Sequence, residues 1–143
     1  MTKKIIIYTD GGSRGNPGDA AIGVVIGDPA KDEAGKAYGE CIGKATNNAA
    51  EYSAVIFGLK KAKQLFGKEE CTNAEIEVRA DSELVVKQMN GEYKIKEEEL
   101  QKLFIEIWNL KTDFKKVSFH HIPREENKIA DKMVNKALDE RLF

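Results

Sequence analysis

Four acidic residues occupy positions where the sequence pattern predicts burial. Asp10 and Asp81 each follow a run of strand-like residues, and Glu51 and Asp131 lie on the apolar faces of two expected helices. A carboxylate placed in a core destabilises the fold by several kcal/mol unless it is paired or binds a cation. These positions span the chain, so the fold must bring distant segments together, and one shared metal site accounts for all four.

The length and composition are typical of one soluble domain. The chain has 143 residues with 41% hydrophobic content, and we expect a single domain over residues 1–143. The net charge of −1 does not indicate a nucleic-acid binder, although acidic metal ligands would offset a basic substrate face. Cys41 and Cys71 share no motif spacing, which indicates free thiols in a reducing compartment. Neither a signal peptide nor an apolar run of about 20 residues is evident, so we expect a cytoplasmic protein.

Three consecutive strands are expected at the start of the chain. Their apolar content places them at residues 4–9, 20–26 and 37–43, and the polar segment 27–35 predicts the hairpin loop between the second and third strands. Short connections between consecutive strands indicate an antiparallel meander.

Helices and strands alternate in the rest of the chain. Thr46 is expected to cap the first helix and Gly67 to end it, whereas Ser82 caps a short helix that Gly91 ends. The remaining elements are a strand at 74–80, a helix at 97–110 with Leu100, Leu103, Phe104, Ile107 and Trp108 on its apolar face, a strand at 117–122 that Pro123 ends, and a helix from about 125. This order predicts an α/β fold whose sheet is partly antiparallel and partly parallel.

The segment from Asp10 to Gly18 is rich in residues that bend the chain, since five of its nine residues are glycine or proline. Two interpretations are open: an ordinary tight turn between strands, or a loop whose backbone N–H groups approach a ligand. The segment is not a Walker loop, because no Gly-Lys-Ser/Thr sequence follows. It is not a dinucleotide fingerprint either, because a strand follows it instead of a helix.

Other polar residues also have two interpretations each. Thr46, Asn47 and Asn48 open a helix, where they either cap it or contact phosphate and sugar groups. Asp81 is either a helix cap or a metal ligand, and Asp131 is either a ligand or the partner of a neighbouring lysine. The joint pattern favours the functional interpretation more than any single motif does.

The ordered motifs of the chain resemble those of ribonuclease H type 1. They are Asp10-Gly-Gly with Gly-Asn-Pro-Gly, Thr46-Asn-Asn with Glu51, Asp81-Ser82, and Asn127 with Asp131. The resemblance covers nearly the whole chain. It implies a five-stranded mixed sheet with its first three strands antiparallel, flanked by helices. It also implies endonucleolytic cleavage of the RNA strand of RNA–DNA hybrids, leaving 5′-phosphate and 3′-hydroxyl ends.

The resemblance implies that Asp10, Glu51, Asp81 and Asp131 are metal ligands. Carboxylate oxygens suit Mg²⁺, which prefers octahedral oxygen coordination, and Mn²⁺ is a plausible substitute. Two such ions can activate a water molecule and stabilise the leaving 3′ oxygen, so the protein needs no nucleophile of its own.

The resemblance also implies substrate contacts. Asn16, Asn47 and Asn48 match positions that touch the minor groove, where 2′-hydroxyl groups mark the RNA strand. Thr46 matches a residue that contacts a DNA phosphate. Further contacts are expected from the glycine-rich backbone, at Gly11 and Ser13.

Some family members carry a basic protrusion after their third helix, and here a short loop before the helix expected at 97–110 replaces it. Lys94 and Lys96 lie in this loop beside Tyr93 and form either a solvated face or a strip that binds a nucleic-acid backbone. The chain therefore resembles the compact subgroup of the family and is expected to act as a monomer. Glu83 stands where some relatives have a neutral amide, which puts one groove contact in question.

Two residues before the last helix compete for a role in turnover. His121 matches the spacing of a family histidine that assists proton transfer or product release. However, His121 can also belong to the preceding strand, and Arg124 can then reach the site instead.

Two other functions are compatible with the same fold. The chain could be a binding module without catalysis, which the presence of all four carboxylates disfavours. It could also be a resolvase-like or integrase-like enzyme that acts on DNA, which the asparagine pair and the glycine-rich segment disfavour.

Overall fold

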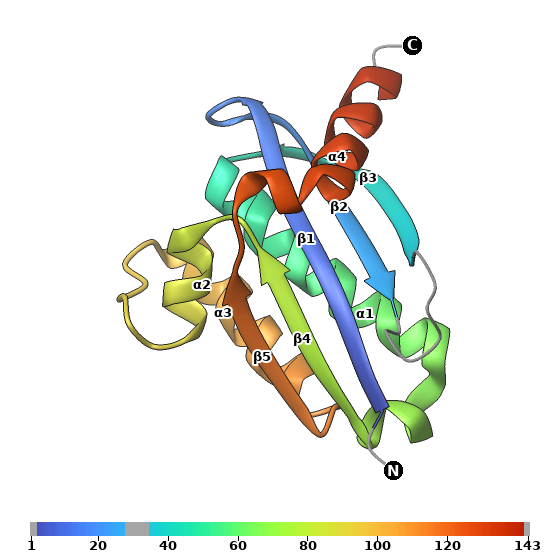
Figure 1. The fold of residues 1–143 in the computed structure, drawn as a ribbon. Coiled ribbons are helices and arrows are strands. Elements are labelled where there is room, and N and C mark those ends of the chain that lie inside the picture. Colours follow the sequence, from blue (N-terminus) through green and yellow to red (C-terminus); the bar gives the residue numbers. More distant parts are fainter. Residues whose placement is uncertain (1–2, 28–34, 142–143) are drawn as a thin grey trace.

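The first three strands form the antiparallel meander that the sequence predicts (Figure 1). They are β1 (Lys3–Gly15), β2 (Gly18–Gly27) and β3 (Lys36–Ala45) in a computed structural model that describes residues 3–27 and 35–141. The hairpin loop expected at 27–35 falls mostly at 28–34, outside the described residues.

β1 is longer than the sequence pattern predicts. It continues through Asp10 to Gly15 and pairs with β2 up to the Gly15–Gly18 pair, so the glycine-rich segment is mainly strand. The expectation of a turn or loop from Asp10 onward was therefore wrong for residues 10–15. Glycine lowers strand propensity, but here the ladder with β2 and the close approach of neighbouring helices outweigh that local preference.

β4 (Ala74–Ala80) and β5 (Lys116–His121) complete the sheet, which has the strand order β3-β2-β1-β4-β5. β4 runs parallel to β1, and β5 runs parallel to β4. This mixed sheet with three antiparallel strands confirms the expected fold class. Thr9 pairs with Ala80, so Asp10 and Asp81 follow at the same end of adjacent strands.

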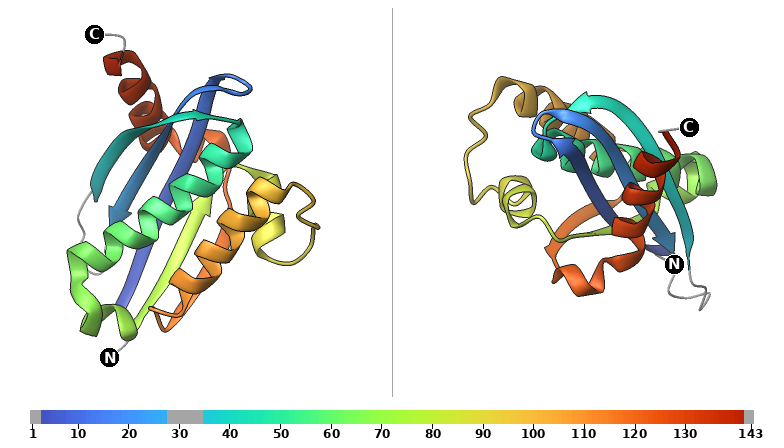
Figure 2. Two further views of the ribbon diagram at one scale, coloured as in Figure 1. Left: turned by 180° about the vertical axis from the view of Figure 1, so that it is seen from behind. Right: turned by 90° about the horizontal axis from the view of Figure 1, so that it is seen from above.

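Helices flank both faces of the sheet (Figures 1 and 2). The helices α1 (Asn47–Thr72) and α3 (Glu98–Lys111) cover one face, and α4 (Lys128–Arg141) crosses the other face over β2 and β3. The short helix α2 (Glu83–Met89) follows Asp81, and the 3-10 turn η2 (Arg124–Glu126) precedes α4. Within the described residues, no helix has the length and apolar character needed to cross a membrane.

Most helix boundaries follow the predicted capping residues. The Oγ1 atom of Thr46 accepts a hydrogen bond of 3.1 Å from the N–H of Ala49, and Ser82 caps α2 in the same way. Gly67 interrupts α1 as expected, with φ of 83°, but a further helical segment continues to Thr72. Trp108 was expected in the core, and it is 57% exposed because α3 buries only a narrow stripe against α1.

α4 lies very close to the sheet because two paired glycines face it. Gly23 pairs with both Asp10 and Gly39, which forms a row across β1, β2 and β3. A Cβ atom at Gly23 would lie 2.0 Å from the Ala130 carbonyl oxygen, so no larger residue fits there without moving the helix. α4 packs through a small apolar cluster of its own, formed by Ala21, Val134 and Leu138 with Ala137 at its edge. The glycine row therefore positions the first turn of α4, which carries Asp131, alongside Asp10.

Candidate active site

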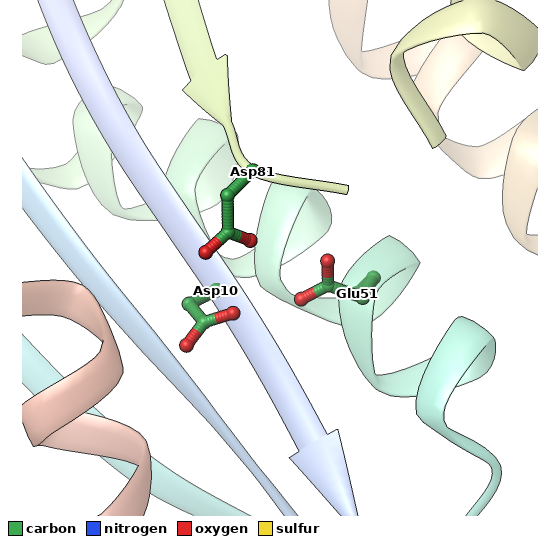
Figure 3. Close-up of side chains that lie close together, drawn as sticks. All are labelled: Asp10, Glu51 and Asp81. Carbon is green, nitrogen blue, oxygen red and sulfur yellow. The ribbon is translucent and has the colours of Figure 1, made fainter. Parts of the chain in front are cut away.

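Three carboxylates meet at the end of the sheet where β4 gives way to α2 (Figure 3). One oxygen atom from each of Asp10, Glu51 and Asp81 lies within 4.8 Å of the other two. Asp10 belongs to β1 and is 9% exposed, Asp81 directly follows β4, and Glu51 comes from the first turns of α1. The parallel register of β1 and β4 and the packing of α1 on β1 thus bring together residues that are distant in the sequence.

Gly11 allows Glu51 to reach this cluster. A Cβ atom at Gly11 would lie 2.3 Å from the backbone carbon and oxygen of Ala50, so only glycine permits this contact between α1 and β1. The Gly11 N–H group donates a short hydrogen bond to Oε1 of Glu51. Gly11 therefore holds a cluster residue in place, and its contact with substrate stays a prediction.

The protein environment disfavours negative charge on all three carboxylates. Burial, followed by the negative charge of Asp81, raises the pKa of Asp10 to about 7. Burial and the charge of Asp10 raise the pKa of Glu51 well above its ordinary value, and burial also raises the pKa of Asp81. A bound cation relieves the same repulsion that otherwise favours protonation. An all-oxygen donor set of this kind fits a hard divalent cation such as Mg²⁺.

Asp131 lies beside the three-residue cluster. Its negative charge contributes to the raised pKa values of both Asp10 and Asp81. Its Oδ1 atom lies 3.8 Å from Nη2 of Arg124, and its side chain is 35% exposed. The structure thus brings Asp10, Glu51 and Asp81 within reach of one ion and places Asp131 next to them, on the side of α4.

Asn127 connects the segments that carry these carboxylates, a role that the sequence pattern did not reveal. It is 1% exposed, and its Nδ2 group donates a 2.8 Å hydrogen bond to the carbonyl of Thr9. A hydrogen bond from the Asn127 side chain partly offsets the rise in the pKa of Asp81. The backbone carbonyl of Asn127 also accepts a 3.1 Å hydrogen bond from the N–H of Asp131. Asn127 and Asp131 form one of the motifs of the family resemblance, but their spacing does not reveal that Asn127 is buried or which groups it contacts.

Three of the predicted substrate-binding residues form one hydrogen-bonded group. The Oδ1 atom of Asn47 accepts from the Ser13 N–H at 2.9 Å and from the Ser13 hydroxyl at 3.1 Å. The Asn47 N–H donates to Oδ1 of Asn16 at 3.0 Å. The β1–β2 hairpin is thereby attached to the start of α1. Thr46 caps that helix, and Asn48 is half-buried one turn before Glu51.

The remaining predicted residues are exposed around the same end of the sheet. His121 is the last residue of β5 and borders a surface pocket with Glu83 and Lys87 of α2. Glu83, an expected departure from the family pattern, pairs with Lys87 at 2.8 Å. Lys94 and Lys96 are exposed in the loop at residues 90–97, which joins α2 directly to α3, as expected for the compact subgroup.

Comparisons with known proteins show which family shares this sequence and fold. A family model described as "Reverse transcriptase-like" matches residues 8–137. The "Ribonuclease H" of Clostridium botulinum is 33% identical, and the alignment covers 96% of this chain and 97% of that relative. The chain belongs to the ribonuclease H family. Among solved structures of ribonuclease H type 1, LC11-RNase H1 in complex with an RNA/DNA hybrid is 47% identical, with a TM-score of 0.90 over 97% of this chain and 99% of that chain.

Some ribonuclease H relatives are much longer than this chain. The "Bifunctional protein Rv2228c" of Mycobacterium tuberculosis is 39% identical over 95% of this chain, which corresponds to 36% of its own length. The chain thus spans about a third of the length of these mycobacterial relatives.

Proposed function

We propose that this chain is an endoribonuclease that hydrolyses the RNA strand of RNA–DNA hybrids and leaves 5′-phosphate and 3′-hydroxyl ends. The observation that carries the proposal is the convergence of Asp10, Glu51 and Asp81 within 4.8 Å on a ribonuclease H fold. The complex of LC11-RNase H1 with an RNA/DNA hybrid supports the choice of substrate.

The four carboxylates Asp10, Glu51, Asp81 and Asp131 would hold two Mg²⁺ ions, with Mn²⁺ as a possible substitute. When bound, the ions supply an activated water molecule and stabilise the leaving oxygen of an in-line displacement. The protein supplies fixed oxygen ligands. Gly11 anchors Glu51, and Asn127 links the backbone before Asp10 to the helix that carries Asp131.

The group formed by Ser13, Asn16 and Asn47 supports recognition of the minor groove of a hybrid. Asn47 uses its Oδ1 atom within the protein, which leaves its Nδ2 group as a donor for the substrate. Asn48 is close by and would contact a neighbouring sugar or base edge. Thr46, at the start of α1, would contact a phosphate of the DNA strand.

Arg124 is our preferred candidate for a turnover residue. Its side chain points to Asp131, whereas His121 ends β5 and borders α2. Arg124 would bind the scissile phosphate through its positive charge or help to release the product. Lys94 and Lys96 would contact the nucleic-acid backbone away from the cut.

We further propose that residues 1–143 act as one domain and a monomer in the cytoplasm. All five strands belong to one sheet, and both apolar clusters of the described residues pack on it. The thiols of Cys41 and Cys71 are free, in line with a reducing compartment.

One gel tests the proposed activity. Labelled RNA–DNA hybrid, double-stranded RNA, double-stranded DNA and single strands are each incubated with Mg²⁺, with Mn²⁺ and with a chelator. We expect metal-dependent cutting of the RNA strand of the hybrid, no cutting of double-stranded DNA, and fragments whose new 5′ ends carry phosphate. The same gel shows whether double-stranded RNA is also cut. Cleavage of double-stranded DNA would instead identify a DNA-processing enzyme, and hybrid binding without cleavage would identify a binding module.

A further inference from the structure

A buried polar chain connects α1 to the loop at residues 90–97. The Tyr52 hydroxyl donates a 2.5 Å hydrogen bond to Oε1 of Gln88, and Nε2 of Gln88 donates to the carbonyl of Lys94 at 3.1 Å. Tyr52 is 0% exposed and Gln88 is 4% exposed. A buried glutamine without one of these partners would keep an unsatisfied polar atom in the core, so the two hydrogen bonds hold each other in place.

The direction of these hydrogen bonds is fixed. The carbonyl oxygen of Lys94 can only accept a hydrogen bond, so the group of Gln88 that faces it is the amide nitrogen Nε2. Oε1 of Gln88 then faces Tyr52 and accepts the hydrogen bond from the Tyr52 hydroxyl.

The same loop is also held at its other positions. The N–H of Glu92 donates to the carbonyl of Lys87 at 2.8 Å, and Nε2 of Gln101 donates to the carbonyl of Ile95 at 2.8 Å. The backbone at residues 90–97 is thereby fixed from α2 and from α3, although the loop stands out from the body of the molecule (Figure 2). The side chains of Lys94 and Lys96 are exposed on this fixed backbone, and no ion pair engages either of them within residues 3–27 and 35–141.

We propose that Tyr52 and Gln88 are positioning residues that set where Lys94 and Lys96 meet the backbone of a bound nucleic acid. The inference rests on the proposed function, because it requires a hybrid substrate. Tyr52 directly follows Glu51 on α1, so one turn of helix holds both a carboxylate of the cluster and the anchor of the basic loop. The distance between the cut site and the lysines is then fixed before binding, and less ordering is required when the hybrid binds.

The test measures hybrid affinity as a function of salt concentration. Binding is measured by fluorescence anisotropy in an Asp10→Asn background, where the substrate is not cut. Lys94→Ala/Lys96→Ala should weaken binding and reduce the slope of log K against log[salt], by about 0.9 for each phosphate that is no longer neutralised. Gln88→Met, which conserves volume, should weaken binding about 3- to 10-fold and also reduce the slope.

Non-additivity is the decisive readout. Gln88→Met added to Lys94→Ala/Lys96→Ala should weaken binding no further, because the positioned groups are already gone. Tyr52→Phe removes only the hydroxyl and should reproduce the effect of Gln88→Met in a variant that folds more readily. Ile107→Val, a change in the α3 core, should lower the melting temperature while hybrid affinity and salt slope stay unchanged.

Two results would overturn the inference: wild-type affinity and slope in both Gln88→Met and Tyr52→Phe, or effects on affinity that add fully to those of the lysine variant. In an otherwise active chain, Gln88→Met should raise KM with kcat unchanged. Failure of the wild-type chain to cut the hybrid would overturn the proposed function. If the wild-type chain cuts the hybrid normally, and the Gln88→Met and Tyr52→Phe variants keep wild-type affinity and salt slope, then only the positioning role is overturned.

Discussion

The guanidinium of Arg124 lies 3.8 Å from the carboxylate of Asp131, measured from Nη2 to Oδ1, and the Arg124 side chain is 81% exposed. An ion pair this exposed contributes little to stability, at most about 1 kcal/mol. Arg124 can therefore leave Asp131 and bind a phosphate without a large loss of protein stability. His121 has no comparable position, since it is the end residue of β5 and borders α2.

Arg124→Ala should lower kcat about tenfold, which corresponds to about 1.4 kcal/mol in the barrier. The shape of the pH–rate profile should not change, because an arginine does not titrate in this range, and Arg124→Lys should keep part of the activity. Steady-state kinetics on a hybrid of defined sequence would measure both effects. If His121→Ala is instead the variant with reduced turnover, and the shape of its pH–rate profile changes, then the histidine has the role.

Asp10→Asn should reduce hydrolysis by far more than tenfold while hybrid binding survives. The change removes one negative ligand of the cation site but leaves the group formed by Ser13, Asn16 and Asn47 intact. Single-turnover cleavage and anisotropy would separate the two quantities. Asp113→Asn is a matched control, because Asp113 pairs with Lys63 at 2.7 Å and is outside the cluster. Activity above about a tenth of the wild-type rate, a change below ~1.4 kcal/mol in the barrier, would remove Asp10 from the catalytic set.

Without divalent cations, the free energy of unfolding should decrease as pH rises from about 4 to about 7. The folded-state pKa values of Asp10, Glu51 and Asp81 are raised, so the folded protein binds more protons than the unfolded chain in this range. Urea denaturation in a chelator at several pH values would measure the slope. Glu77 acts in the opposite direction, because hydrogen bonds and charges from Arg79 outweigh its burial and lower its pKa, so its contribution disappears only at acidic pH.

The Asp10→Asn variant shows how much of this pH dependence comes from the carboxylate cluster. It should be more stable than the wild type at pH 7 by on the order of 2 kcal/mol in chelator, and its decrease with pH should be shallower. Mg²⁺ should stabilise the wild type more at pH 7 than at pH 5. Identical slopes for both proteins would mean that the pKa of Asp10 is not raised in the folded protein.

Asn47→Ala should weaken hybrid binding by roughly 0.5–1.5 kcal/mol for each hydrogen bond removed, and should reduce discrimination against double-stranded DNA. Its effect should exceed that of Asn48→Ala, because Asn47 also attaches the β1–β2 hairpin through Ser13. Competition binding with hybrid and double-stranded DNA would measure both quantities. Unchanged affinity and selectivity in both variants would leave these asparagines with a structural role only.

Gly11→Ala should destabilise the fold and weaken metal binding together. The new Cβ would overlap the backbone of Ala50, which must move and carry Glu51 with it. Gly12→Ala is the matched control, since a Cβ there meets only a Val134 methyl group at an ordinary 3.6 Å. Thermal unfolding with and without Mg²⁺ would compare them, and similar behaviour of the two variants would contradict the role of Gly11.

The sequence predicts elements well where one local signal dominates. The alternation of apolar and polar residues places β4 at 74–80, and capping residues locate the starts of α1 and α2. Asp10 and Asp81 could be assigned to one site because both are acidic residues at positions where the pattern predicts burial, and the parallel pairing of Thr9 with Ala80 does place them side by side. The extension of β1 to Gly15 could not be predicted, because it depends on the pairing with β2 and not on the residues themselves.

Contacts between distant segments account for the other gaps. Trp108 has the spacing of a core residue, and only the orientation of α3 against α1 shows that it is exposed. Asn127 and Gln88 look like ordinary polar residues of a helix, yet each is at least 96% buried with partners in other segments. No local pattern distinguishes such residues, since their partners are far away in the sequence.

The separate apolar cluster beneath α4 has a consequence for behaviour on heating. α4 is held by Ala21, Val134 and Leu138, whereas the main core lies on the opposite face of the sheet. Segments with few buried apolar contacts open locally at lower free energy than the whole domain. We expect amide protons of α4 to exchange by such local opening. Each opening moves Asp131 away from Asp10, Glu51 and Asp81, which stay in place. Turnover should therefore decrease at temperatures where the central sheet is still folded.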